Sequence, residues 1–251
     1  GETSTLNLTL GYSYNDSEIG NPGTSFTAAE NFRAVVAEDI NQVPVGVSLR
    51  NTPQNFVISG TLSTEIWSGY RTSVTAFFQR REGAKISAVF NGEPFASDIG
   101  DTGGRARNLL YVPTGPSDPL VNFDPAFDTD AFFDWADKNG LKRGEIQSKG
   151  RLQESWSSDL DLRFQQEIPF FGRATAKIYF DIENFLNFID ADWGKKRYID
   201  TTDIQSAVGV VTAGIDSVTN TYNFTAFTEP TKLPDTFDSL YRIQLGIRAQ
   251  F

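Results

Sequence analysis

Cysteine, methionine and histidine are all absent from this sequence of 251 residues. The absence of cysteine excludes disulfides, thiolate metal sites and cysteine nucleophiles. The absence of histidine excludes Ser-His-Asp triads, Cys-His pairs, histidine zinc sites and a histidine general base. A hydrolase would have to work with carboxylates alone, or with residues from another segment. We therefore expect a protein that is not an enzyme.

Positive charge is also scarce, because 22 basic residues stand against 32 acidic ones and the net charge is -10. Such a balance repels phosphate backbones, so we expect no nucleic-acid partner. No apolar run reaches the roughly 18 to 20 residues of a membrane helix. The longer runs, such as 207–211, have the length of a strand. If the chain spans a bilayer, it must therefore do so as a β-barrel.

Apolar and polar residues alternate with a period of two, which predicts β-strands. In residues 6–14, leucine and tyrosine occupy every second position, with small or polar residues between them. About eight segments read as strands by such patterns. Besides the first, they are 56–62, 70–78, 159–168, 176–183, 207–215, 221–228 and 241–251. In 207–228, the face that points outward is ambiguous.

The connections between these segments differ systematically in length. Short turns alternate with long connections at 15–53, 91–156, 187–204 and 229–237. Outer-membrane barrels have short periplasmic turns and long extracellular loops, whereas soluble sandwiches show no such alternation. The sequence therefore predicts an all-β fold, an antiparallel transmembrane β-barrel with long extracellular loops. An independent barrel of about eight strands, the smallest natural size, remains a structural alternative.

The end of the sequence has the features of a sorting signal. Gln244, Gly246, Ala249 and Phe251 follow one another as a polar residue, a glycine, an apolar residue and a final aromatic. This pattern resembles the terminal signal by which the outer-membrane assembly machinery recognises its substrates. The resemblance implies that this machinery and outer-membrane lipid are partners of the chain.

Several short motifs, in their order along the chain from about residue 55 onward, resemble the Oar-type, carboxypeptidase-regulatory-like branch of TonB-dependent receptors. They are Leu110-Tyr111-Val112-Pro113 after the Asp- and Gly-containing stretch 98–104, the strand 159–166, Asn184-Phe185-Leu186-Asn187 and Asp192-Trp193-Gly194. The resemblance implies a barrel of about 22 strands, a plug domain in its lumen and an N-terminal segment that contacts TonB.

On this interpretation, residues 1–251 are the C-terminal part of such a barrel, and the plug and N-terminal strands are absent from the sequence. We then expect a segment with an export signal to precede Gly1. The implied function is uptake of an external ligand across the bacterial outer membrane, coupled to TonB through the absent regions. An adhesin or scaffold barrel, which binds a partner through its loops without transport, is the alternative.

Aromatic residues near the ends of the expected strands suit the two aromatic girdles of a membrane barrel. Packing in a soluble fold is the other interpretation. The residues are Tyr12, Tyr14, Trp67, Tyr70, Phe170, Phe171 and Trp193.

Charged residues fall on one face of the hairpin formed by 159–168 and 176–183. Paired carboxylates invite an acid-base hypothesis. We favour a charge-compensated wall that contacts plug or water, with no catalytic residue. The residues are Asp161, Arg163, Lys177, Asp181 and Glu183.

The longest loop offers two further features. Asp98 and Asp101 with nearby glycines suggest a calcium loop, but the spacing lacks the regularity of one, and we favour a solvated loop without a cofactor. Five aromatic residues accompany four aspartates, and they predict either a small folded core or a surface that captures ligand or protein. A surface lipoprotein partner is left open, and the composition suits peptides, sugars or metal chelates. These residues are Phe123, Phe127, Phe132, Phe133 and Trp135 with Asp124, Asp128, Asp130 and Asp134.

Overall fold

The computed structural model describes residues 4–21, 23, 26–33, 35–39, 42–48, 51–92, 107–171, 174–201 and 207–250. The chain is mainly β, with 52% strand and 9% helix, and one of its several sheets is curled like half of a barrel. This confirms the predicted all-β class. Within these ranges, no helix has the length and apolar character needed to cross a membrane.

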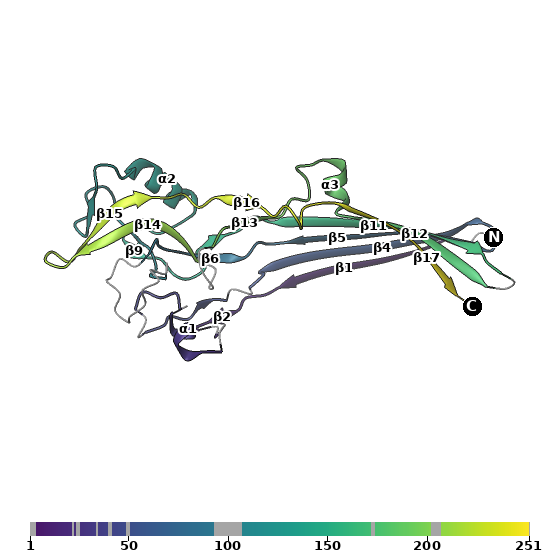
Figure 1. The fold of residues 1–251 in the computed structure, drawn as a ribbon, viewed down its shortest axis with the longest axis horizontal. Coiled ribbons are helices and arrows are strands. Elements are labelled where there is room, and N and C mark those ends of the chain that lie inside the picture. Colours follow the sequence, from purple (N-terminus) through teal and green to yellow (C-terminus); the bar gives the residue numbers. More distant parts are fainter. Residues whose placement is uncertain are drawn as a thin grey trace.

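The largest element is an antiparallel sheet of six strands, here called the long sheet. Its two short turns and both chain ends lie at one end, and all long connections leave from the other (Figure 1). The turn between the second and third strands contains Gly69 at a φ of +80°, a conformation that favours glycine. In spatial order the strands are β1 (Thr5–Tyr14), β4 (Gln54–Trp67), β5 (Tyr70–Arg81), β11 (Ser157–Pro169), β12 (Thr175–Glu183) and β17 (Arg242–Gln250).

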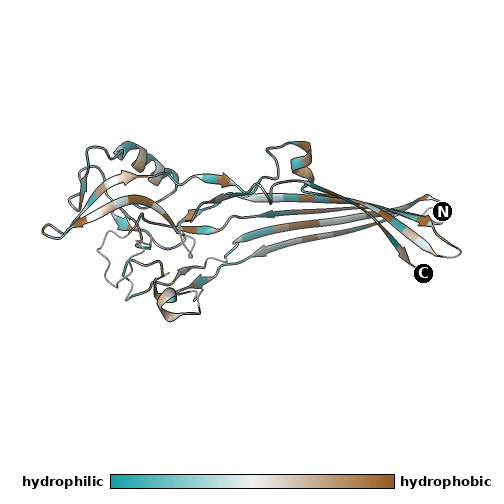
Figure 2. Ribbon diagram, in the orientation of Figure 1, coloured by the Kyte–Doolittle hydropathy of each residue, from teal (hydrophilic) through white to brown (hydrophobic). Residues whose placement is uncertain are grey.

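The register of the long sheet separates apolar from polar side chains. Because side chains alternate along each strand, in-register pairing gives the sheet an apolar face and a polar face. Figure 2 shows hydrophobic and hydrophilic residues following one another along these strands. One row on the apolar face contains Leu6, Leu62, Val74, Phe164, Phe180 and Leu245. The adjacent row on the polar face contains Asn7, Thr61, Thr75, Arg163, Asp181 and Gln244.

Among the residues that the structure describes, no second protein layer covers the apolar face. Leu6 is 68% exposed, Leu62 49% and Leu245 73%. A sheet that buried this face against another sheet would hide such side chains, as a sandwich does. Most of the large buried residues lie instead beyond the end of the long sheet from which the long connections leave.

The long sheet is open along both sides. β1 pairs only with β4, and β17 only with β12, among the residues that the structure describes. A closed barrel is therefore not present, and the sheet contains six of the eight strands expected from the sequence.

The other two expected strands belong to a different sheet. β14 (Ala207–Asp216) and β15 (Thr221–Phe227) form the hairpin that the sequence predicts, but the expectation that they are barrel strands is wrong. They lie in a five-stranded sheet with the order β10-β6-β14-β15-β8. Ala207, Val208, Val210 and Val211 are all buried, at 5% exposure or less. A continuous apolar run of this kind is typical of a strand covered on both faces.

Two long loops interlock to form this second sheet. The β14–β15 hairpin belongs to the connection between β12 and β17. It inserts between β6 (Lys85–Phe90) and β8 (Val121–Phe123), which belong to the connection between β5 and β11, and it pairs in parallel with both. The remaining strand is β10 (Leu152–Gln153), and helix α2 (Thr129–Lys138) belongs to the same core. We call residues 85–90, 107–153 and 207–227 the loop module.

The remaining elements are short. They are β2 (Glu18–Ile19) paired with β3 (Gly46–Val47), β7 (Tyr111–Val112) with β9 (Glu145–Ile146), β13 (Arg197–Ile199) with β16 (Lys232–Pro234), and helices α1 (Ala28–Arg33) and α3 (Phe185–Ile189).

The aromatic residues of the longest loop form the core of the loop module. Phe224 is fully buried and lies within about 6 Å, centroid to centroid, of Phe90, Phe123, Phe127 and Phe132. Of the two interpretations left open by the sequence, the folded core is confirmed. Because these rings are committed to the core, they do not provide a ligand-capturing surface. Four of the predicted residues are 6% exposed or less, namely Phe127, Phe132, Phe133 and Trp135.

Aspartates of the same loop organise its backbone. Asp128 caps α2, since its side chain accepts a hydrogen bond from the N–H of Ala131 at 2.9 Å. Asp118 is buried and accepts from the backbone and hydroxyl of Thr114, from the N–H of Leu120 and from the hydroxyl of Tyr111. Burial raises the pKa of Asp118, but these donors outweigh it and leave the pKa below its ordinary value. Burial, together with Asp118, raises the pKa of Tyr111 to about 12.

Phe224→Ala is expected to lower the free energy of unfolding of the loop module by about 3 to 5 kcal/mol, because the change leaves a cavity among packed rings. The measurement is denaturant titration of Trp135 fluorescence, with the other three tryptophans (Trp67, Trp156 and Trp193) replaced by phenylalanine. Val218→Ala at the exposed tip of the hairpin is the control and should stay within about 0.5 kcal/mol. An unchanged transition in Phe224→Ala would show that the hairpin is not part of this core.

Candidate functional site: the polar face of the long sheet

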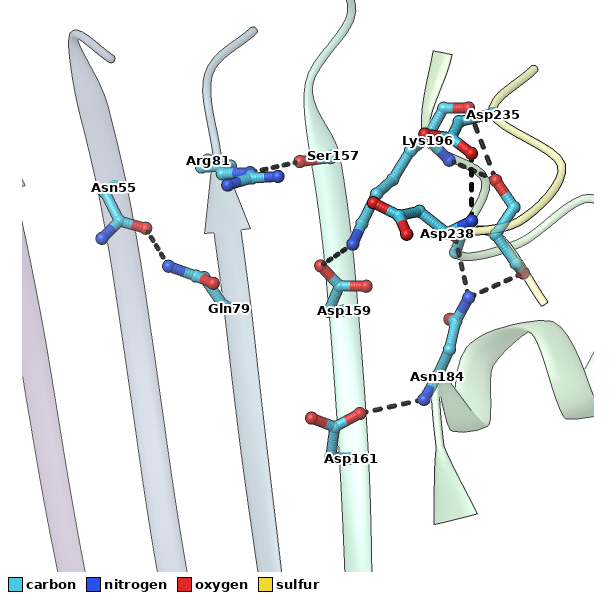
Figure 3. Close-up of polar contacts among 12 residues, drawn as sticks. Asn55, Gln79, Arg81, Ser157, Asp159, Asp161, Asn184, Lys196, Asp235 and Asp238 are labelled. Atoms are coloured by element: carbon cyan, nitrogen blue, oxygen red, sulfur yellow. Dashed lines mark hydrogen bonds and ion pairs between the residues drawn. The ribbon is translucent and has the colours of Figure 1, made fainter. Parts of the chain in front are cut away.

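Polar side chains on the polar face are hydrogen-bonded from strand to strand. The hydroxyls of Thr61 and Thr75 lie 3.0 Å apart, as do those of Ser63 and Ser73. Nearer the loops, Gln79 donates to Asn55 at 2.9 Å, as Figure 3 shows. Buried polar groups need such partners, and the network makes the face suitable for water or other polar material.

Charges on the β11–β12 hairpin compensate one another. Arg163 makes two hydrogen bonds to Asp181, both of 2.7 Å, and its guanidinium lies 5.2 Å from the ring centre of Tyr179. Lys177 pairs with Glu167 at 3.2 Å, and Glu183 with Arg242 of the next strand at 3.6 Å. The predicted charge compensation is thus confirmed for Arg163, Lys177, Asp181 and Glu183. Asp181 and Glu183 each have a cationic partner, an arrangement that gives no support to an acid-base pair.

The remaining carboxylate of the predicted set, Asp161, has a different role. It accepts a hydrogen bond of 2.9 Å from the backbone N–H of Asn184, which follows β12 (Figure 3). Asn184 has a φ of +50°, in the left-handed region. Its side-chain amide donates to the carbonyls of Gly194 and Ser239, at 3.1 and 2.8 Å. One residue therefore connects the β11–β12 hairpin to both arms of the long connection between β12 and β17.

A lysine makes a second connection at the same place. Lys196 pairs with Asp159 of β11 at 3.4 Å, and its backbone N–H donates to the Ser239 hydroxyl at 3.0 Å. Figure 3 shows Lys196 reaching across to β11 from the connection between β12 and β17. We call Asp159, Asp161, Asn184, Lys196 and Ser239 the loop anchor. The loop anchor holds the base of the segment that carries the β14–β15 hairpin.

A hollow lies beside the loop anchor on the polar face. It has a volume of about 220 Å³, and its lining includes Phe77, Gln79, Asp159, Glu183, Lys196 and Arg242. Both signs of charge face it, with one aromatic ring. Such a lining suits polar, hydrogen-bonding material.

An aromatic band crosses the end of the long sheet that is nearer the loops. The rings of Tyr12 and Phe56 are 4.8 Å apart, and those of Phe56 and Trp156 are 6.3 Å apart. Arg80 lies over Trp156, at 5.3 Å from the ring centre. Tyr12 was predicted as an interface residue. Phe56 and Trp156 were not predicted. Phe56 lies opposite Tyr12 only through the pairing of β1 with β4, and Trp156, which precedes β11, joins the band through its ring contact with Phe56.

A second group of aromatics lies at the short turns. Trp67 and Tyr70 are 5.0 Å apart across one turn, and Phe170 and Phe171 are 5.0 Å apart at the other. Phe56 and Trp67 are eleven residues apart on β4. At about 3.3 Å per residue and a tilt of about 45°, this gives a band about 26 Å high, close to the apolar height of outer-membrane barrels.

Two other predicted interface residues lie near the long loops. Tyr14 ends β1 and is 66% exposed. Trp193 lies in the turn after α3, with its N–H donating to the carbonyl of Asp190, and is 52% exposed. Their exposure is what an interface aromatic requires, but the geometry does not place Trp193 in the row of Tyr12 and Phe56.

The residues of the predicted assembly signal lie on β17. Gln244 is opposite Asp181, and Ala249 is opposite Ala176. Gly246 is opposite Tyr179, and the end of the tyrosine ring lies where a Cβ at Gly246 would be. A larger residue at this position would have to displace the ring. Phe251 lies outside the described residues.

No cation site is apparent in the part of the chain that the structure describes, where no three acidic residues converge in a way that could hold a metal ion. Asp98 and Asp101, the residues of the weak calcium prediction, lie outside that part.

Asn184→Ala is expected to loosen the loop anchor for two reasons. It removes the two side-chain hydrogen bonds, and alanine tolerates a positive φ less well than asparagine does. Hydrogen exchange in residues 194–199 and 232–239 should accelerate by about tenfold or more, the effect of about 1.4 kcal/mol. Asn184→Gly is the matched variant, because it tolerates the φ but lacks the side chain. If exchange in Asn184→Gly equals that of the unaltered protein, the side-chain bonds do not hold the connection between β12 and β17.

Neither the scan against protein-family models nor the searches of curated proteins and of solved structures found a match to this chain.

Proposed function

We propose that the long sheet is part of the wall of a bacterial outer-membrane β-barrel, with its apolar face toward lipid and its polar face toward the lumen. The observation that carries the proposal is the exposed apolar face, bordered by aromatic residues at both ends of the strands. Lipid is the environment that covers such a face without a second protein layer.

The open sides of the long sheet support a wider barrel. The outer edges of β1 and β17 carry unpaired backbone groups within the described part of the chain. Such groups cannot remain unpaired in hydrocarbon, so further strands must pair with them. In a TonB-dependent receptor of the Oar-type branch, the rest of a barrel of about 22 strands would supply these strands.

On this proposal the chain is the C-terminal wall and loop segment of a receptor that takes up an external ligand. The loop module would lie outside the cell, since the long connections all leave from one end of the sheet. The loops would capture the ligand, and TonB would act through a plug domain that this segment does not contain. The charge-compensated polar face would contact that plug or lumenal water.

A second function is favoured by one observation, the size and order of the loop module. Its packed core is larger than a loop needs simply to connect two strands. An outer-membrane adhesin or scaffold would use such a module to bind a partner, and nothing would be transported. Transport and adhesion differ in their dependence on TonB.

The experiment compares strains of the producing bacterium that lack this gene or lack TonB. Labelled peptides, sugars and iron chelates are offered to both, and the protein is located by fractionation. We expect the protein in the outer membrane, and uptake of one nutrient class to fall to the same level in both strains. Reintroducing the gene should restore that uptake. Unchanged uptake with reduced attachment to cells or surfaces would favour the adhesin, and absence from the outer membrane would contradict both.

A further inference from the structure

A buried lysine lies under one of the small ribbons of the external loops. Lys149 is only 8% exposed. β3 passes directly over it, so closely that a Cβ on Gly46 would come within 2.7 Å of the Cβ of Lys149. The next residue, Gly150, has a φ of +67° and lies equally close to Val47. β3 therefore covers the aliphatic part of this side chain.

The ammonium group of Lys149 has few partners for a buried charge. It donates one hydrogen bond, of 2.7 Å, to the carbonyl of Gly20. No ion pair joins it to a carboxylate elsewhere in the described residues. An ammonium has three donors, and burying it without an anion is costly. Burial accordingly lowers the pKa of Lys149. The unused donors are available to an anionic group.

Lys149 lines a cavity of about 400 Å³, a volume within the usual range of small-molecule sites. Glu38 and Asp39, which are both exposed, line the same cavity. Glu38 forms no ion pair with Lys149 among the described residues. The lining is also partly apolar, with Pro44, Val45, Leu109 and Ile146. The cavity thus presents one buried cation, two carboxylates at exposed residues and an apolar surface to whatever enters it.

We propose that this cavity, here called the lysine pocket, binds a short peptide with free ends. The peptide carboxylate pairs with Lys149, its amino group with Glu38, and an aliphatic side chain lies on Leu109 and Ile146. A simple anion would pair with Lys149 but would be repelled by the carboxylates of Glu38 and Asp39, whereas a ligand with one charge of each sign interacts favourably with both. The inference rests on the proposed function in one respect, because it names the ligand class that the external loops would capture.

Isothermal titration of the detergent-solubilised full chain with the dipeptide Ala-Leu tests the inference. We expect saturable binding, and a loss of about tenfold or more in either Lys149→Met or Glu38→Gln, as for one charge-assisted hydrogen bond. Blocked peptides supply a second arm. N-acetyl-Ala-Leu should bind the unaltered chain about as weakly as Ala-Leu binds the Glu38→Gln variant. Ala-Leu amide should bind the unaltered chain about as weakly as Ala-Leu binds the Lys149→Met variant.

Combining each protein variant with each blocked peptide gives two double-mutant cycles. Acetylation should cost little further affinity in Glu38→Gln, and amidation little further in Lys149→Met. Lys142→Met and Glu145→Gln, an exposed ion pair of the same module, are the matched controls and should leave affinity unchanged. If Lys149→Met does not fold, Glu38→Gln and the blocked peptides still test the pocket.

Absence of Ala-Leu binding overturns the inference, and so does binding that neither Glu38→Gln nor the blocked peptides weaken. The titration requires no membrane, plug or TonB. A failure here is therefore distinct from a failure of outer-membrane location or TonB-dependent uptake, which the strain comparison measures.

Discussion

The exposed apolar face of the long sheet is the feature on which the rest of the structure depends. Each of its aliphatic side chains would cost about 1.5 to 3 kcal/mol if it faced water instead of an apolar environment. In-register pairing across six strands gathers these side chains on one surface, and it gathers the hydroxyl, amide and charged side chains on the other. The same register therefore produces both the exposed apolar face and the hydrogen-bonded polar face.

The loop module is stabilised differently, because its apolar side chains are buried in a core of their own. This aromatic core is centred on Phe224, and it is complete only when the β14–β15 hairpin pairs with β6 and β8 of another connection. The loop anchor then holds the connection that carries this hairpin to β11 and to the end of β12. The long sheet and the loop module thus have different sources of stability, and Asn184 and Lys196 connect the long sheet to the segment that carries the β14–β15 hairpin.

The long sheet could be predicted because its signal is local. Period-two alternation and turn residues identify all six strands, and the charged residues of β11 and β12 were correctly expected to compensate one another. The hairpin of β14 and β15 was assigned to the wrong sheet. A strand buried on both faces differs in sequence from a strand with one apolar face only by losing its alternation, as in 207–211. The roles of Phe56, Trp156 and Lys149 could not be predicted, because they come from strand pairing, from a contact between rings far apart in the sequence and from the cover provided by β3, which short-range patterns do not encode.

The central claim is that hydrocarbon, and not protein, covers the apolar face. The natural absence of cysteine allows single nitroxide labels on the full chain in lipid vesicles, with labels at 8, 62 and 245 compared with labels at 7, 61 and 244. Power saturation should show the first three accessible to oxygen dissolved in lipid and the second three accessible to an aqueous nickel chelate. Equal accessibility of both sets to the chelate, or protection of the first set from both reagents, would contradict the account.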